Sequence, residues 1–344
     1  MINLEKEIRE QPEVLARLKE INACTIVNLV KEIKEKNITN IYFAARGTSD
    51  HACVFAQYLF GSVLGIQCTL GTPSLFTQYN TQINFSNSLV VGVSQSGRAE
   101  DVNAVLESAN KQGMITVSIT NNVDSLLAKT SKYHLFCGAG EEKSIAATKT
   151  FTAQMYLLAL LCAEWSQNFE LINALEILPS QVKDALEYIP DQMECVAKTL
   201  LNYNEAVVLA RGLSYPIALE GALKILETNK MKVKGYPISD FYHGPVAQLH
   251  DNDLAVVLAQ SGIMYDDSIK MIDKLNSVNA NTVIISDLEG LNTKNSIKIK
   301  NTNSDFTMPF IFAISMQLMA LKLVLLKGID PDKSNVIAKI TVTK

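Results

Sequence analysis

The sequence has little of several features that would point to particular functions. Charged residues make up 19% of its 344 residues, the formal net charge is −4, the pI is near 5.7, and no stretch is strongly basic. Nucleic-acid binding needs clustered Lys and Arg to neutralise phosphates, so we do not expect nucleic acid as a partner. Low-complexity segments are also missing, and the 48% of hydrophobic residues is typical of a folded enzyme.

Histidine and cysteine are scarce. The four histidines (His51, His134, His243 and His250) lack the spacing of metal ligands, so we expect neither a metal nor an organic cofactor. None of the six cysteines forms a CxxC pair, and most have apolar neighbours. We therefore expect reduced thiols that pack as small core residues, in a protein of the cytoplasm.

Targeting and membrane signals are weak. Residues 1–10 are charged and do not resemble a signal peptide. The longest apolar run, residues 310–326, is interrupted by Ser315, Gln317 and Lys322. We expect a buried helix here rather than a membrane span, and no membrane partner.

The chain contains an internal repeat. Ala-Arg-Gly-Thr-Ser at residues 45–49 recurs as Ala-Arg-Gly-Leu-Ser 165 positions later. Gln-Ser-Gly at 95–97 recurs at the same offset, and Thr-Val-Ser-Ile at 116–119 is matched by Thr-Val-Ile-Ile at an offset of 166. A nearly constant offset across three separated segments predicts two copies of one structural unit.

Each copy alternates apolar strands with helices, which is typical of a parallel sheet covered on both faces. The predicted fold is α/β, with two tandem doubly wound, flavodoxin-like units at residues 1–175 and 176–344. In the first unit we expect a strand at 40–45, a polar loop, and a helix from residue 51. A long helix from residue 145 closes that unit.

Hydroxyl side chains follow two strands of the first copy. In a doubly wound sheet, ligands bind beyond the carboxyl ends of the strands. Hydroxyl donors beside helix N-termini suit a phosphate monoester, although Ser and Thr also cap helices for structural reasons alone. The candidate residues are Thr48, Ser49, Ser94, Gln95 and Ser96.

The second copy helps to decide between these two readings. It has Ala259 where the first copy has Ser94, and Leu213 where the first has Thr48. A purely structural cap would be needed equally in both copies, so we infer one phosphate site, in the first copy. A nucleotide site is disfavoured, because no GxxxxGK[ST] loop occurs and Lys143 interrupts a possible GxGxxG motif.

Acid–base chemistry is predicted in the second copy. Glu220, Lys224 and Glu227 are spaced by four and three residues, so they share one helix face. Such a row can be a solvated salt-bridge face, but the neighbouring residues are largely apolar. A carboxylate in apolar surroundings can have a raised pKa and can move a proton between carbons. His243 precedes Gly-Pro in a polar-aromatic turn, and a histidine there can open a sugar ring.

Together these motifs resemble the sugar isomerase (SIS) family, and within it most closely the isomerase half of glucosamine-6-phosphate synthase. The resemblance covers nearly the whole chain. It is carried by residues 47–49, 94–97, 215–224, 243–245 and 337–342.

The resemblance implies a role for each candidate. Five residues would hold the sugar phosphate: Thr48, Ser49, Ser94, Gln95 and Ser96. Glu227 would carry the proton between C1 and C2, while Glu220 and Lys224 line the site. Lys339 would reach the sugar from the C-terminal tail.

Two further roles follow from the resemblance. Ile145 and Ala146 would touch the substrate through their backbone. His243 would assist ring opening, and in related proteins it comes from the neighbouring subunit, so a homodimer is implied.

The sequence also departs from the synthase. It begins at the isomerase half, so we expect no glutaminase domain and no nitrogen from glutamine by that route. Arg98 and Ala99 replace an acidic residue and a threonine, and Arg98 with Asp101 is similar to stand-alone amino-sugar-phosphate deaminases. Asp240 replaces Glu and Ala147 replaces Ser, so contacts to the sugar hydroxyls are expected to differ.

The favoured function is isomerising deamination of glucosamine 6-phosphate, or a close relative, to the ketose 6-phosphate and ammonia. Plain aldose–ketose isomerisation and a deglycase reaction on fructosamine 6-phosphates remain alternatives, because all three use related enediol or enolamine chemistry. A non-catalytic sugar-phosphate sensor is less favoured. Such a sensor could lose Glu227, His243 or Lys339, and this chain has all three.

Overall fold

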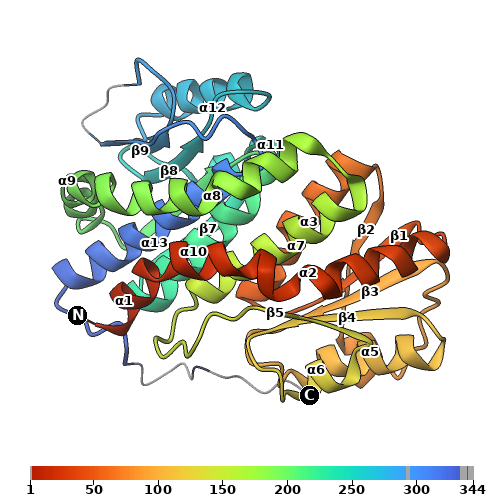
Figure 1. Ribbon diagram of the computed structural model, residues 1–344. Helices are drawn as coiled ribbons and strands as arrows, with labels where there is room; N and C mark the ends of the chain where they lie inside the picture. The colour runs from red at the N-terminus through yellow and green to blue at the C-terminus, as the bar shows by residue number, and fades with distance from the viewer. Residues whose placement is uncertain (1, 292–294, 334–338, 340–344) are drawn as a thin grey trace. The chain divides into compact units, whose positions relative to one another are not determined.

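The computed structural model describes residues 2–291, 295–333 and 339. These residues form two compact units (Figure 1). The first-copy unit contains residues 11–142, 149–176 and 339, and the second-copy unit contains residues 2–10, 143–148 and 177–333. The predicted boundary between residues 175 and 176 stays a prediction.

The first-copy unit is built on a parallel five-stranded sheet of order β2-β1-β3-β4-β5. This is the flavodoxin-like order, in which the chain reverses direction across the sheet between β1 and β3. In Figure 1, α5 and α6 lie on one face of the sheet, and α2 and α7 on the other. The strands are β1 (Asn40–Ala44), β2 (Gln67–Leu70), β3 (Ser88–Val93), β4 (Ile115–Thr120) and β5 (Tyr133–Phe136). The helices are α2 (Gln11–Glu35), α3 (Thr48–Leu64), α4 (Ser74–Thr77), α5 (Glu100–Lys111), α6 (Leu126–Thr130) and α7 (Lys149–Ser166), and α8 (Phe169–Tyr188) starts here.

The second-copy unit has a parallel sheet of order β10-β9-β8-β6-β7. Read from β7, its strands follow the same order as those of the first copy, so the predicted fold class of two tandem α/β units is confirmed. The strands are β6 (Glu205–Ala210), β7 (Lys232–Pro237), β8 (Leu254–Ala259), β9 (Asn281–Ser286) and β10 (Ser296–Lys298). The helices are α1 (Asn3–Arg9), α9 (Pro190–Leu200), α10 (Tyr215–Asn229), α11 (Ile238–Tyr242), α12 (Tyr265–Ser277) and α13 (Met308–Leu326), with short 3-10 turns at Gly212–Ser214 and Pro245–Gln248.

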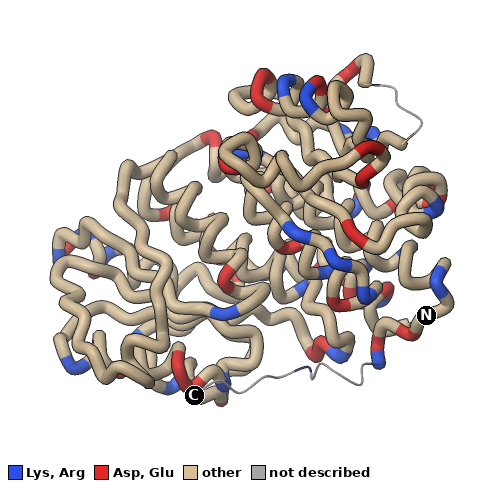
Figure 2. The backbone as a smooth tube through the Cα atoms, turned by 180° about the vertical axis from the view of Figure 1, so that it is seen from behind, with Lys and Arg blue, Asp and Glu red and all other residues tan. Residues whose placement is uncertain are grey.

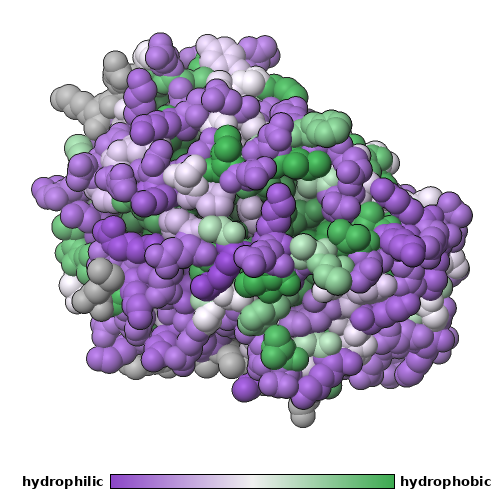
Figure 3. Space-filling model, in the orientation of Figure 1, coloured by the Kyte–Doolittle hydropathy of each residue, from purple (hydrophilic) through white to green (hydrophobic). Residues whose placement is uncertain are grey.

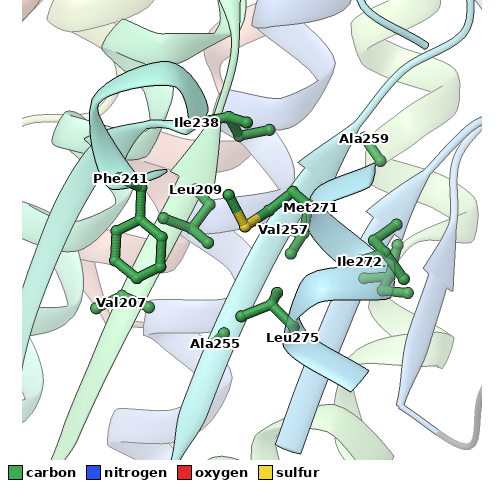
Figure 4. Packing of buried hydrophobic residues seen from close by; sticks show 11 residues of the cluster. Val207, Leu209, Ile238, Phe241, Ala255, Val257, Ala259, Met271, Ile272 and Leu275 are labelled. Atoms are coloured by element: carbon green, nitrogen blue, oxygen red, sulfur yellow. The ribbon is translucent and has the colours of Figure 1, made fainter. Parts of the chain in front are cut away.

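A hydrophobic cluster in the second-copy unit fixes α11 to the sheet (Figure 4). Ile238 and Phe241 are 1% and 0% exposed, and they pack with Leu209 of β6 and Met271 of α12. Because both anchors lie inside α11, the chain that leaves this helix starts from a fixed point. His243 is the first residue after α11.

The observed elements differ from the predicted ones at two helix starts. Helix α3 begins at Thr48 rather than residue 51, so the two predicted phosphate ligands of the first loop lie in its first turn. Helix α7 begins at Lys149 rather than residue 145, because residues 143–148 belong to the second-copy unit and are not helical. The prediction also missed β2, β7 and β10, which are three of the four outer strands of the two described sheets.

The apolar run near the C-terminus forms α13, which is buried as predicted. Its length and composition would allow it to cross a membrane, but 83% of its apolar window is covered by the rest of the protein.

Acidic and basic residues are interspersed along both units (Figure 2). On the face drawn in Figure 3, polar side chains predominate and apolar ones form small groups.

Candidate active site

The predicted phosphate ligands lie where the strand order of the first-copy sheet reverses, between β1 and β3. Strands β1 and β3 are paired neighbours, and the loops that leave their carboxyl ends carry Thr48 and Ser49 on one side and residues 94–96 on the other. Gly47 enters α3 with φ of +54°, a conformation that favours glycine. Thr48 and Ser49 thus occupy the positive end of the α3 dipole, where an anion is stabilised.

The loop after β3 is tightly folded. The Gly97 N–H donates to Ser94 Oγ at 3.2 Å, and the Arg98 N–H donates to Ser96 Oγ at 3.3 Å. Gly97 has φ of +64°, and a Cβ there would lie 2.1 Å from Ser125 Oγ, so only glycine fits. Because both serine hydroxyls accept hydrogen bonds from the loop, their own protons remain to be donated to a ligand.

Arg46 and Arg98 are the basic residues next to these loops in the sequence, and Arg98 is exposed. Arg46 is already paired, since its Nε lies 2.8 Å from Oδ2 of Asp101, whose side chain is 1% exposed. Burial raises the pKa of Asp50 in the first turn of α3, and the charges of His51 and Arg46 oppose that rise. Binding of an anion would therefore depend on hydroxyls, backbone N–H groups and helix dipoles, with Arg98 as the adjacent exposed cation.

The equivalent loops of the second copy are occupied by the protein's own carboxylates. Asp287 accepts hydrogen bonds from Ser261 N at 2.8 Å and from Ser261 Oγ at 2.5 Å. Gln260 Nε2 donates to Asp305 Oδ1 at 3.1 Å. The residue of the first copy that aligns with Asp287 is the neutral Asn121. An anion is thus disfavoured in the second copy by charge as well as by the loss of hydroxyls.

The three predicted acid–base residues come together on α10. Lys224 Nζ lies 3.2 Å from Glu220 Oε1 and 2.7 Å from Glu227 Oε2, so one ammonium group joins two carboxylates. Burial lowers the pKa of Lys224, but the charges of Glu220 and Glu227 outweigh this and leave it raised. The side chain of Glu227 is 18% exposed, whereas those of Lys224 and Glu220 are 2% exposed. Glu227 is therefore the carboxylate of this row that a ligand can reach.

His243 belongs to the second-copy unit and Lys339 to the first-copy unit. His243 is exposed, and within the described residues it makes no hydrogen bond or ion pair with the acid–base residues of α10. Lys339 Nζ donates to Glu142 Oε2 at 2.9 Å, in the first-copy unit. Oε2 of Glu142 also accepts from Thr150 Oγ1 at 2.8 Å, and its side chain is 0% exposed.

The backbone pair Ile145 and Ala146 lies in the short segment 143–148 of the second-copy unit. A buried residue that the sequence analysis missed, Glu7, accepts hydrogen bonds from the start of this segment. Glu142 was missed as well. No repeat or motif marks either position, whereas the neutral Asn121 could have been found by aligning the two copies.

A family model described as the SIS domain matches residues 32–163 and 199–327. The chain belongs to the SIS domain family. This confirms the resemblance that the motifs predicted, and the matched ranges fall one in each copy of the repeat.

Relatives of this SIS chain are similar over nearly its full length. The glutamine–fructose-6-phosphate aminotransferases of Aquifex aeolicus and Thermococcus kodakarensis are 33% and 30% identical to it, over 98% and 97% of the chain. The chain spans 57% of the length of each of these relatives. The C-terminal domain of the glucosamine-fructose-6-phosphate aminotransferase of Francisella tularensis has a TM-score of 0.85 and 26% identity, covering 97% of this chain and 98% of that domain.

Proposed function

We propose that this protein is a phosphosugar isomerase-type enzyme that acts on a hexose or amino-sugar 6-phosphate. The favoured reaction is the isomerising deamination of glucosamine 6-phosphate, or a close relative, to the ketose 6-phosphate and ammonia. The observation that carries the proposal is the row Glu220–Lys224–Glu227, in which a buried ammonium group holds two carboxylates and one carboxylate stays accessible.

The proposed phosphate ligands are the hydroxyl and amide groups of the first copy. Ser94 and Ser96 have protons to donate, and Thr48 and Ser49 stand at the N-terminus of a 17-residue helix. A phosphate monoester needs several donors at once, and this pair of loops supplies them from two neighbouring strands.

The proposed reaction moves one proton between two carbons. Ring opening breaks the C1–O5 bond and gives the C1 aldehyde. Glu227 then takes the C2 proton, the electron pair of the C–H bond forms a C1–C2 double bond, and the carbonyl oxygen at C1 takes up a proton. Return of the proton to C1 leaves an imine at C2, which water hydrolyses to the ketone with release of ammonia.

Glu227 is better suited than Glu220 to be the base that takes the C2 proton. Both carboxylates contact Lys224, so the row carries one net negative charge when all three groups are ionised. Glu220 is almost fully buried and stays committed to neutralising Lys224. The more exposed Glu227 is free to exchange a proton with a ligand, and general acid–base catalysis of this kind contributes about 10²–10⁴-fold in rate.

His243 and Lys339 are proposed to assist at the sugar. His243 is exposed on a turn that α11 holds in place, as a residue that serves a neighbouring subunit would be, so we propose a homodimer. Lys339 would have to leave Glu142 to reach a ligand. We also propose a cytoplasmic location, which the free state of all six cysteines supports.

Deamination is preferred because of one residue beside the phosphate loop. Arg98 stands next to the phosphate loop, exposed, with its N–H on Ser96 Oγ. An arginine at this position, with Asp101 after it, is the feature in which this sequence resembles the stand-alone amino-sugar-phosphate deaminases.

The first test is incubation of the purified protein with glucosamine 6-phosphate while ammonia and fructose 6-phosphate are measured together. Equal release of both supports deamination. Failure to release ammonia from any hexosamine 6-phosphate rules it out, and the same assay with glucose 6-phosphate and fructosamine 6-phosphate then separates plain isomerisation from deglycation.

The second test is the variant Glu227→Gln. Turnover should fall by about 10²–10⁴-fold, whereas binding of glucitol 6-phosphate, an open-chain analogue without a carbonyl group, should persist. Turnover equal to that of the unmodified protein would show that another residue moves the proton.

A further inference from the structure

The N-terminal helix α1 directs one buried carboxylate at the segment 143–148. Glu7 is 3% exposed. Its Oε1 accepts hydrogen bonds from Lys143 N at 2.5 Å and from Ser144 N at 3.3 Å, and the Ser144 hydroxyl donates to its Oε2. Three donors from two consecutive residues thus converge on one side chain.

The rest of the segment is fastened inside the same unit. Ser144 Oγ lies 2.9 Å from the Ala146 carbonyl oxygen, and Gln317 Nε2 of α13 lies 3.5 Å from the Thr148 carbonyl oxygen. Within the described residues, the N–H groups of Ile145 and Ala146 donate no hydrogen bond. The flanks of the segment are therefore fixed while two amides in its middle remain unused.

Helix α1 is itself held in place. Asp332 accepts hydrogen bonds from Asn3 N at 2.7 Å and Leu4 N at 3.2 Å, so its carboxylate caps the start of the helix. Leu4 and Ile8 are 2% and 0% exposed, and the helix packs against α13. Glu7 thus extends from a fixed helix rather than a loose terminus.

The charge of Glu7 ties it to one conformation of the segment. A buried carboxylate is costly unless hydrogen bonds satisfy it, and charge-assisted hydrogen bonds are about twice as strong as neutral ones. If the segment moved, Glu7 would lose its donors together. We propose that Glu7 is a positioning residue that holds the Ile145 and Ala146 amides ready for the sugar part of the substrate. This inference rests on the proposed function, which gives these two amides their ligand.

The test compares Glu7→Gln with the matched control Glu5→Gln. Both variants remove one charge from α1, but Glu5 makes a partly exposed ion pair with Arg9, 3.2 Å away, which contributes little. A third variant, Ser144→Ala, removes the hydroxyl donor alone. Titration calorimetry measures binding of glucitol 6-phosphate and of inorganic phosphate, and hydrogen exchange follows the amides of residues 143 and 144 in the free protein.

We expect Glu7→Gln to weaken glucitol 6-phosphate binding about tenfold, or about 1.4 kcal/mol, and to leave phosphate binding unchanged. In Glu7→Gln, hydrogen exchange at residues 143 and 144 should also accelerate. Ser144→Ala should change binding and exchange in the same direction but by less. Glu5→Gln should change neither the binding of glucitol 6-phosphate nor the exchange. A general loss of folding would weaken the binding of glucitol 6-phosphate and of inorganic phosphate equally, so it would not give this result.

Three results would overturn the inference. If the unmodified protein binds glucitol 6-phosphate and Glu7→Gln binds it equally well, Glu7 does not position the segment for the sugar. If Glu7→Gln binds both glucitol 6-phosphate and inorganic phosphate more weakly, the role of Glu7 is structural. If the unmodified protein binds neither probe, the proposed function fails and the substrate role of Glu7 fails with it, whatever the exchange data show.

Discussion

The two copies of the repeat share a topology but differ in what occupies the point where the strand order reverses. Both keep an ion pair between the loop after the first strand and the helix after the third. Arg46 lies 2.8 Å from Asp101 in the first copy, and Arg211 lies 3.0 Å from Asp267 in the second. The two loops are therefore folded alike, and their difference lies in the groups that they present.

In the second copy, these groups are satisfied by the protein itself. Asp287 takes both the N–H and the hydroxyl of Ser261. In the first copy, Ser96 Oγ accepts the Arg98 N–H instead, and Asn121 replaces the aspartate. Under the proposed function, one fold keeps an anion site in one copy and closes it in the other by substitutions that leave the strand order unchanged.

The largest expected effect on folding stability concerns the shared ion pair. Asp101 is 1% exposed and Asp267 is 44% exposed. Asp101→Asn should lower the free energy of unfolding by about 2 kcal/mol, because it leaves a buried hydrogen-bonding site mismatched. Asp267→Asn should lower it by less than about 1 kcal/mol. Urea unfolding of both variants measures this difference, and equal losses would break the comparison.

A smaller effect is expected for the serines that occupy equivalent positions. Ser96→Ala should weaken glucitol 6-phosphate binding about tenfold, about 1.4 kcal/mol, by removing one donor. Ser261→Ala removes a hydroxyl that already binds Asp287, so sugar-phosphate binding should stay within about twofold of the unmodified protein. Calorimetric titration checks both variants, and a loss of binding confined to Ser261→Ala would reverse the assignment of the site.

The smallest effect is a difference in acid sensitivity. Burial lowers the pKa of His134 on β5 from 6.5, although a hydrogen bond with Thr120 opposes this. The unfolded chain then binds more protons than the folded one, so His134 stabilises the first-copy unit above pH 6.5, and this contribution is lost as the pH falls through the folded-state pKa. Ser296 on β10 occupies the position equivalent to His134 in the second-copy sheet, and a serine side chain does not titrate in this pH range.

Hydrogen exchange at pH 7.5 and pH 5 should therefore show a loss of protection in β5 that β10 does not share. His134→Gln should remove the difference. Equal losses in the two strands, or a loss that persists in the variant, would show that another group is responsible.

The repeat, the strands that form the sheet centres and the row on α10 could be predicted from the sequence, because each leaves a local pattern. β8 shows such a pattern, since its six consecutive apolar residues form a fully buried strand. β2 was missed because it has four residues and its burial alternates with exposure at the sheet edge. Periodicity cannot separate such a strand from a loop.

The supporting carboxylates could not be predicted, because their partners are far apart in the sequence. Glu7 and Ser144 are separated by 137 residues, and Glu142 and Lys339 by 197. The start of α7 was predicted four residues too early for a related reason. The segment before it is held by Glu7 and Gln317, which no local helix propensity reflects.

The most direct test of the central claim exchanges the residues that distinguish the two copies, Asn121→Asp and Asp287→Asn, and measures glucitol 6-phosphate binding by calorimetry. The Asn121 side chain binds Ala139 N and Gly140 O, and its backbone N–H donates to Gln95 O of the proposed phosphate loop. A carboxylate at residue 121 would therefore place a negative charge beside this loop and repel the phosphate, so binding should weaken at least about 100-fold, about 2.7 kcal/mol. Asp287→Asn should leave binding unchanged. Full binding by Asn121→Asp, or lost binding in Asp287→Asn, would contradict the claim that the first copy alone holds the phosphate.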